Sequence, residues 1–217
     1  MNRRLLTWAG ALGTVILFAG CAVPTKHVDY SAFKAAKPRS IVVLPPLNES
    51  PDVKATYAVL SQTTYPLAES GYYVLPVAVV EETFRQNGLT VPGDIHQVPV
   101  PKLREIFGAD AALYLPVTDY GSRYQVLSSV TRVAVKGTLV DLKTGKELWK
   151  GSAVAVNDSS ASGGGLIGAL ITAAVTQALN HATDASYPVA GSASIQLLSA
   201  DLPGGVLHGP RSAKYQP

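Results

Sequence analysis

Residues 128–158 read SSVTRVAVKGTLVDLKTGKELWKGSAVAVND, and this stretch decides the fold class. Two long runs rich in β-branched residues, 128–141 and 147–158, flank a short KTGK segment. Glycine in that segment suits a turn position with positive φ, so the pattern predicts an antiparallel β-hairpin. Because the first run also carries Arg132 and Lys136, we expect one face of the hairpin to be exposed to solvent.

A third extended run, 111–120, precedes the hairpin, and upstream of it strands and helices alternate. The elements expected there are a strand at 40–44, a helix at 53–69, a strand at 72–75, a helix at 77–87 and a short helix at 99–107. Alternating elements followed by an antiparallel meander predict an α/β (α+β) domain with a mixed, five-stranded sheet and helices mainly on one face. Gly137 inside the hairpin predicts a β-bulge.

The chain of 217 residues is long enough for one compact domain with tails. We expect a signal peptide at 1–20, a tether at 21–39, a single α/β domain at 40–200 and an irregular tail at 201–217. The formal net charge of +3 falls to about +1 when Arg3 and Arg4 are removed with the signal. No basic cluster follows, so the sequence does not favour nucleic-acid binding.

The N-terminus has the order of an export signal that ends at Cys21, the single cysteine of the chain. Two arginines precede an apolar stretch of about fifteen residues, too short for a permanent membrane span. The run LFAGC at 17–21 resembles a lipobox, which implies that Cys21 carries a diacylglycerol and an N-acyl chain. Without that context, a lone cysteine would be a buried hydrophobe or a free thiol. Ala22 after the cysteine implies, by resemblance to Gram-negative lipoprotein sorting, an outer-membrane destination.

Residues 160–179, SASGGGLIGALITAAVTQAL, form a glycine-rich apolar segment that is open to four interpretations. A phosphate-binding loop would need a Lys followed by Ser or Thr, which is missing. A transmembrane span would need more apolar residues. A buried core helix is one remaining possibility, and a contact surface is the other, because Gly164, Gly168 and Thr172 are spaced four apart and would form one stripe on a helix.

The sequence contains no recognisable catalytic or metal-binding pattern. Four histidines, at 27, 96, 181 and 208, are scattered rather than spaced for metal binding. No nucleophile elbow of the type G-x-S-x-G occurs. We therefore expect no catalytic residue, no metal and no cofactor.

A polar and aromatic stretch at the end of the 111–120 strand is a second candidate contact site. Its members are Asp119, Tyr120, Arg123 and Tyr124. Tyrosine and arginine are enriched in protein contact sites. A plain connection between two strands is the alternative interpretation.

Four segments together resemble a family of bacterial lipoproteins typified by a neisserial surface antigen. They are the lipobox, IVVLPP at 41–46, GADAALYLPVTDYG at 108–121 and GGGLIGALITAAVTQ at 163–177. The resemblance implies a fold similar to the N-terminal domain of TolB and to the periplasmic domain of the secretion channel CsgG. It also implies an outer-membrane lipoprotein working with a CsgG-like lipoprotein in secretion or envelope assembly.

We therefore expect a non-catalytic interaction module, lipid-anchored in the outer membrane and facing the periplasm or the cell surface. Its partner would be a CsgG-like lipoprotein or a second copy of the chain. The alternative is an envelope protein or enzyme that binds glycans or lipids. A deep pocket with converging carboxylates would favour that alternative.

Overall fold

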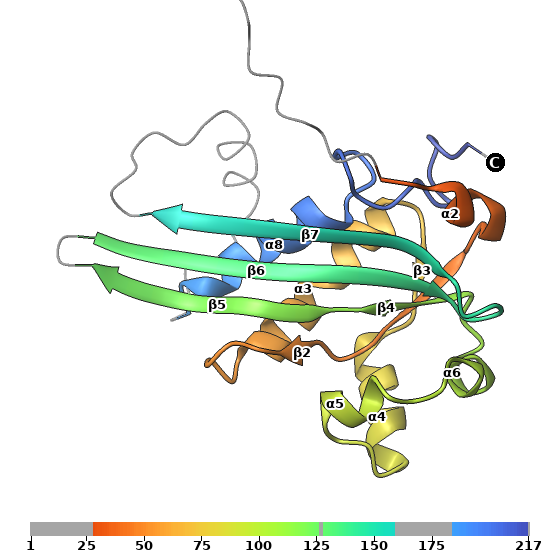
Figure 1. Cartoon of the computed structure of the whole chain (residues 1–217), viewed down its shortest axis with the longest axis horizontal. Helices are drawn as coiled ribbons and strands as arrows, with labels where there is room; N and C mark the ends of the chain where they lie inside the picture. Colours follow the sequence, from red (N-terminus) through yellow and green to blue (C-terminus); the bar gives the residue numbers. More distant parts are fainter. Residues whose placement is uncertain (1–27, 126–127, 159–183, 217) are drawn as a thin grey trace, which may run out of the picture.

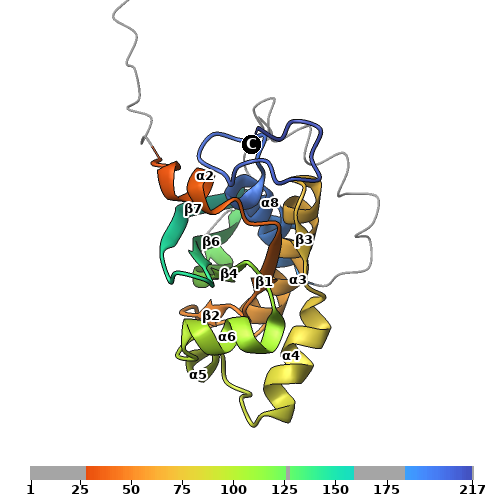
Figure 2. The same ribbon diagram turned by 90° about the vertical axis from the view of Figure 1, so that its right-hand side faces the viewer.

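The computed structural model describes residues 28–125, 128–158 and 184–216. In this part of the chain one mixed, seven-stranded sheet carries helices on both faces (Figures 1 and 2), which confirms the expected mixed α/β class. The elements in chain order are α2 (Ser31–Ala36), β1 (Ser40–Val43), β2 (Leu47–Asn48), α3 (Ala55–Glu69), β3 (Tyr73–Val74), α4 (Val77–Gln86), α5 (Pro92–Ile95), α6 (Val100–Phe107), β4 (Ala111–Tyr114), β5 (Pro116–Gln125), β6 (Ser128–Asp141), β7 (Glu147–Asp158) and α8 (Ser186–Leu198).

The sheet is parallel on one side and antiparallel on the other. Strand β1 pairs in parallel with β3 and β4, and β2 pairs in parallel with β5. The long strand β6 pairs antiparallel with β4 and β5 along one edge and with β7 along the other. The expected hairpin is therefore confirmed, and Gly145 in its turn has the positive φ, 72°, that the sequence predicted.

The sheet has seven strands instead of the expected five, because a proline divides the expected 111–120 strand in two and the short strand β2 was not expected. Pro45 and Pro46 separate β1 from β2, and Pro116 begins β5 directly after β4. Proline lacks the N–H that a sheet ladder requires. The lines still run side by side, since the Leu44 N–H donates to the Leu113 carbonyl at 3.1 Å.

Helices cover both faces of the parallel half, which corrects the expectation of helices mainly on one face. Ile41 and Val43 belong to the core cluster that contains residues of α3 and α8. Val42 and Leu44 belong to a second cluster, with residues of α4, α5 and α6. Figure 2 shows these three helices grouped away from α8. The uninterrupted apolar run of β1 is explained by burial on both sides.

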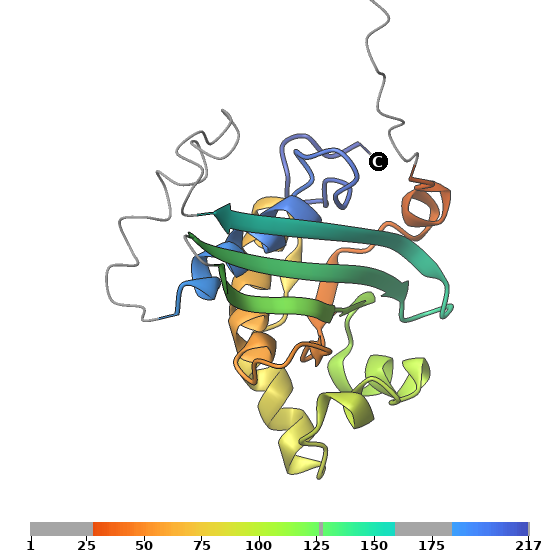
Figure 3. The same ribbon diagram turned by 60° about the vertical axis from the view of Figure 1, so that its left-hand side comes forward.

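In the described part of the chain, helices cover the β5–β6–β7 half on one face only. Val133 and Val135 of β6 are buried at 0% and 1% exposure in the core cluster shared with α8. Val154 and Val156 of β7 are 44% and 52% exposed. In Figure 3 the three strands lie in front of α3 and α8, and no described helix lies in front of them. The exposed hairpin face predicted from the sequence is present.

Two glycines of the hairpin make room for an indole ring rather than for a bulge. A Cβ atom at Gly137 would lie 2.9 Å from Cζ3 of Trp149, and a Cβ atom at Gly151 would also run into the indole. Gly137 pairs regularly with Gly151, so the bulge expected at Gly137 is wrong. The register shift lies instead between Leu139 and Val140.

The folded region begins before residue 40, so it includes part of the expected tether. Helix α2 packs Phe33 into the core at 3% exposure. The Tyr30 hydroxyl donates to the carbonyl of Gly205 at 2.6 Å. A short helix that buries an aromatic ring is fixed to the domain, so within residues 21–39 the described part from Tyr30 onward is folded structure.

The C-terminal tail is irregular as expected, but it is packed against the core. The Trp149 indole N–H donates to the Gly204 carbonyl at 2.9 Å, and the Tyr72 hydroxyl donates to the Leu207 carbonyl at 2.6 Å. Val206 between them is 2% exposed. These aromatic donors supply partners for backbone groups that have no strand or helix to satisfy them.

Candidate interaction site

Asp119, Tyr120 and Arg123 lie inside β5 and not in a connecting loop. The strand continues to Gln125 because each of these residues pairs with β6. A register shift lies between Val117 and Asp119. The expected position at a strand end is therefore wrong, since the pairing with β6 extends the strand beyond the predicted boundary.

Tyr120 is a core residue and not a contact residue. Its side chain is 2% exposed, and its hydroxyl donates to Oδ2 of Asp184 at 2.8 Å. Burial raises the pKa of Tyr120, and the neighbouring Asp184 carboxylate raises it further. The other Asp184 oxygen accepts from the N–H of Ser186 at the start of α8. Tyr120 therefore joins β5 to α8, and it is removed from the candidate contact site.

Asp119 instead holds two arginines on the open face of the strands. Its carboxylate lies 3.2 Å from Nη2 of Arg123 and 3.3 Å from Nε of Arg132. The Asp119 side chain is 20% exposed, whereas those of Arg123 and Arg132 are 74% and 45% exposed. Surface pairs of this kind add little to stability, at most about 1 kcal/mol. Their charge and donor groups remain available to a partner.

Two exposed valines adjoin this ion-pair group. Val156 pairs with Arg132, and Val154 pairs with Ala134, which lies two residues after Arg132 in β6. We call the group of Asp119, Arg123, Arg132, Val154 and Val156 the open-face patch. Arginine is enriched in protein contact surfaces, and the apolar side chains at the centre of such surfaces become buried when the partner binds.

Sequence reasoning placed Arg132 on the exposed hairpin face but did not connect it to Asp119. The contact depends on the register of β5 against β6, which a single sequence does not specify. Val154 and Val156 alternate with buried Ala153 and Ala155. That alternation was the one sequence signal from which the exposure of the two valines could have been predicted.

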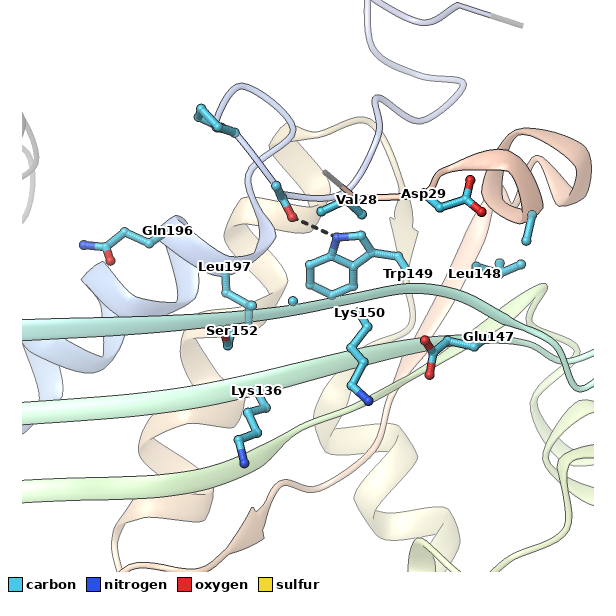
Figure 4. A pocket seen from close by; sticks show the side chains of 14 residues that line it. Val28, Asp29, Lys136, Glu147, Leu148, Trp149, Lys150, Ser152, Gln196 and Leu197 are labelled. Carbon is cyan, nitrogen blue, oxygen red and sulfur yellow. Dashed lines mark hydrogen bonds between the residues drawn. The ribbon is translucent and has the colours of Figure 1, made fainter. Parts of the chain in front are cut away.

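A separate cavity of about 770 Å³ adjoins the edge of β7 (Figure 4). Trp149 and Leu197 line it on the side of α8, and Lys136 and Lys150 point from the opposite side of the strands. The indole is 2% exposed and already bonded to Gly204, so its ring is not free to stack on a ligand.

The two carboxylates of this cavity do not converge. Asp29 and Glu147 extend on opposite sides of the β7 ribbon in Figure 4. A paired acid and base must both face one bound substrate. Among the described lining residues, Asp29 and Glu147 are not placed as such a pair.

No group of three or more potential metal ligands occurs among the described residues. His96 has a structural place: its Nε2 lies 2.9 Å from the Pro45 carbonyl, which it must approach as a donor, and its ring meets Tyr114 edge-on at 5.2 Å. Burial lowers the pKa of His96. The neutral ring is therefore the form that the fold favours.

Several sequence-based candidates lie outside the described residues. They are the lipidation residue Cys21 and the glycine-rich stripe of Gly164, Gly168 and Thr172. Tyr124 is placed as part of β5, but its side chain is not described. Among the described helices, none has both the length and the apolar character needed to cross a bilayer.

Comparison with known proteins connects the chain to lipoproteins. Residues 28–211 match the family model described as "Putative lipoprotein GNA1162-like". A curated protein of Neisseria meningitidis serogroup B, also described as a putative lipoprotein, is 52% identical over 207 residues, which cover 95% of this chain and 96% of that protein.

One solved structure shows the same relationship. The crystal structure of lipoprotein GNA1162 from Neisseria meningitidis is 57% identical with a TM-score of 0.57, covering 66% of this chain and 99% of that chain. A PelC dodecamer from Paraburkholderia phytofirmans gives a TM-score of 0.44 at 15% identity, covering 74% of this chain and 85% of that chain. A similarity as low as the second supports no argument about function.

Proposed function

The chain belongs to the GNA1162-like family of lipoproteins, and from this premise we propose that it is a non-catalytic interaction module anchored in the outer membrane. The anchor is Cys21, acylated after removal of residues 1–20. The domain faces the periplasm and uses its open-face patch to bind another envelope protein.

The observation that carries this proposal is the exposure of Val154 and Val156 next to an ion-pair group. The valines are 44% and 52% exposed on a sheet face that no described helix covers. Water around apolar side chains is released when a partner covers them, and that release favours association. Arg123 and Arg132 at the rim would direct the orientation of the partner through charge.

The partner that suits this patch is a protein surface with an apolar centre and acidic groups at its rim. A CsgG-like lipoprotein of a secretion or envelope-assembly system is our first candidate, and a second copy of this chain is the other. Neither requires a cofactor or a catalytic residue in this chain.

A double substitution tests the patch. Val154→Glu with Val156→Glu places two carboxylates in the centre of the patch, and we expect capture of the partner from detergent-solubilised outer membrane to be lost. Val79→Glu is the matched control, because Val79 is 60% exposed on α4, away from the patch. Unchanged capture and an unchanged oligomeric state in the double variant would refute the role of the patch.

A second test concerns the anchor. Cys21→Ser removes the sulfur that would carry the lipid, so the precursor should stay unprocessed in the inner membrane and lose metabolic labelling with palmitate. Labelling that persists in this variant would refute acylation at Cys21.

The cavity beside Trp149 favours a second candidate function, the binding of an envelope glycan or lipid. Trp149 is the sole tryptophan after residue 21, so the tryptophan fluorescence of the mature chain comes from a ring that lines this cavity. A saturable change with an envelope glycan or phospholipid would support this function over the first candidate.

A further inference from the structure

One end of the sheet brings together several chain segments that are distant in sequence. The N–H of Tyr73 donates to the Arg39 carbonyl at 3.0 Å, which joins the start of β3 to the start of β1. The N–H of Arg39 donates to Oδ2 of Asp110 at 2.9 Å, and the Leu142 N–H donates to the Asp110 carbonyl at 2.9 Å. The starts of β1, β3 and β4 therefore meet the turn between β6 and β7.

Five exposed cations cluster at this end, which we call the basic end: Lys37, Arg39, Lys143, Lys146 and Arg211. The two lysines belong to the β6–β7 turn, and Arg39 directly precedes β1. Arg211, from the C-terminal tail, stacks over the Tyr73 ring at 5.2 Å. Helix α2 and the turn lie at the same end of the long strands in Figures 1 and 3.

The carboxylates of the basic end neutralise it only in part. Asp141 is 8% exposed, and its Oδ1 accepts from the N–H groups of Lys143 and Thr144. Asp110 accepts from the Ser40 hydroxyl and N–H. Glu147 is exposed. A hydrogen-bonded carboxylate keeps its charge, and Asp110 also lies 3.9 Å from Nε of Arg39. The five cations and three carboxylates therefore leave a net charge of about +2 at this end.

Lys37 occupies a backbone conformation that normally favours glycine. It ends α2 with φ 47° and ψ 55°, and among the described residues no other non-glycine residue has a positive φ. A side chain in this conformation costs on the order of 1 kcal/mol. A strained residue of this kind suggests that its side chain has a use other than stability.

The anchor brings this end close to the membrane. Residues 22–27 separate Cys21 from Val28, and a fully extended segment spans at most about 3.3–3.6 Å per residue, so Val28 lies within about 25 Å of the acylated sulfur. Helix α2 follows directly and is fixed by buried Phe33 and by the Tyr30 hydroxyl bond to Gly205. The basic end can therefore reach the bilayer surface without unfolding.

We propose that the basic end docks on anionic phospholipid headgroups of the bilayer that holds the anchor. This inference rests on the proposed acylation of Cys21. Each lysine or arginine near an anionic surface strengthens binding by about fivefold. Docking would direct β6 and β7 away from the membrane. Val156 lies nine residues after the start of β7, and a strand rises about 3.3 Å per residue, so Val156 would lie about 30 Å from the turn.

Energy transfer from Trp149 to a dansyl-labelled lipid headgroup tests the docking. The mature protein, purified from membranes, is reconstituted into vesicles of phosphatidylcholine, with or without phosphatidylglycerol. We expect greater transfer with phosphatidylglycerol, and we expect salt to abolish the difference because it screens exposed charges.

Three variants separate docking from folding. Lys143→Gln with Lys146→Gln should lower the ratio of docked to undocked protein by roughly 30-fold. Lys54→Gln with Lys136→Gln removes the same charge from exposed positions outside the basic end and should have no effect. Lys37→Gly should weaken docking by about fivefold while leaving stability unchanged or higher, because glycine relieves the backbone strain.

Flotation of the vesicles at high salt distinguishes the two proposals. Protein that floats but shows equal transfer in both kinds of vesicle retains its anchor and refutes docking. An equal loss of energy transfer in the variant with Lys54→Gln and Lys136→Gln would also refute docking through the basic end. Protein that fails to float lacks the acyl anchor, and both proposals fall together.

Discussion

The two halves of the sheet differ in how far adjacent side chains are exposed. In β1, Val42 and Val43 are adjacent and both are 0% exposed, because helices cover both faces. In β7, Ala155 is 4% exposed and Val156 is 52% exposed, because the described helices cover one face. An exposed valine contributes little to the stability of the fold, so substitutions on the open face should leave the fold intact.

Within the β5–β6–β7 half, the largest loss of stability is expected from substitution of Trp149, on the covered face. Trp149→Ala should lower the free energy of unfolding by about 3–5 kcal/mol, since it empties the site beside two glycines and breaks the bond to Gly204. Val154→Ala, on the opposite face of the same strand, should change it by less than about 0.5 kcal/mol. Urea unfolding measures both, and similar losses would contradict the one-sided burial of β7.

The covered half should respond on both faces. Val42→Ala and Val43→Ala should each lower the free energy of unfolding by about 2 kcal/mol, because each removes buried methyl groups and leaves a cavity. Val156→Ala serves as the exposed comparison. A negligible loss at Val42 would show that α4, α5 and α6 do not cover this face.

A smaller effect is expected where the glycine accommodates the indole. Gly137→Ala should cost about 1 kcal/mol, because its Cβ would sit 2.9 Å from Cζ3 of Trp149 and 3.3 Å from Cδ2 of Leu197. In the Trp149→Ala background the same change should cost almost nothing. A double-mutant cycle by urea unfolding measures this coupling, and additive losses would contradict the contact.

The smallest effect is a pH dependence that arises in the covered half. Burial holds the pKa of His96 below its ordinary value, so the unfolded chain binds a proton that the folded chain does not. The stabilisation is therefore complete above a pH of about 6.5 and is lost as the pH falls toward the lowered pKa. His96→Gln should flatten this part of the stability profile relative to the unsubstituted protein. A profile unchanged by His96→Gln would assign the loss to other groups.

The features that the sequence predicted correctly are those that depend on a local pattern of residues. The apolar run of β1, the hairpin with Gly145 and the alternation along β7 depend on neighbouring residues, and all three are present in the structure. The covering of Val42 by α4–α6 was missed, since an apolar run does not reveal which helix covers which face.

The site was predicted in part, for a similar reason. Asp119 and Arg123 lie four apart in one strand, and both belong to the open-face patch. Tyr120 was misassigned and the contact of Arg132 was missed, because strand register decides which side chains meet. The hydrogen bonds from Tyr30 and Trp149 to the C-terminal tail join residues distant in sequence, which no local pattern indicates.

Photo-crosslinking in intact cells tests most directly whether the open face is the contact surface of this lipoprotein. A photoreactive residue at position 156 is compared with one at position 79, since Val156 and Val79 are similarly exposed, at 52% and 60%. Our account predicts one discrete crosslinked species from position 156 and none from position 79. Equal crosslinking from both positions, or none from position 156, would contradict it.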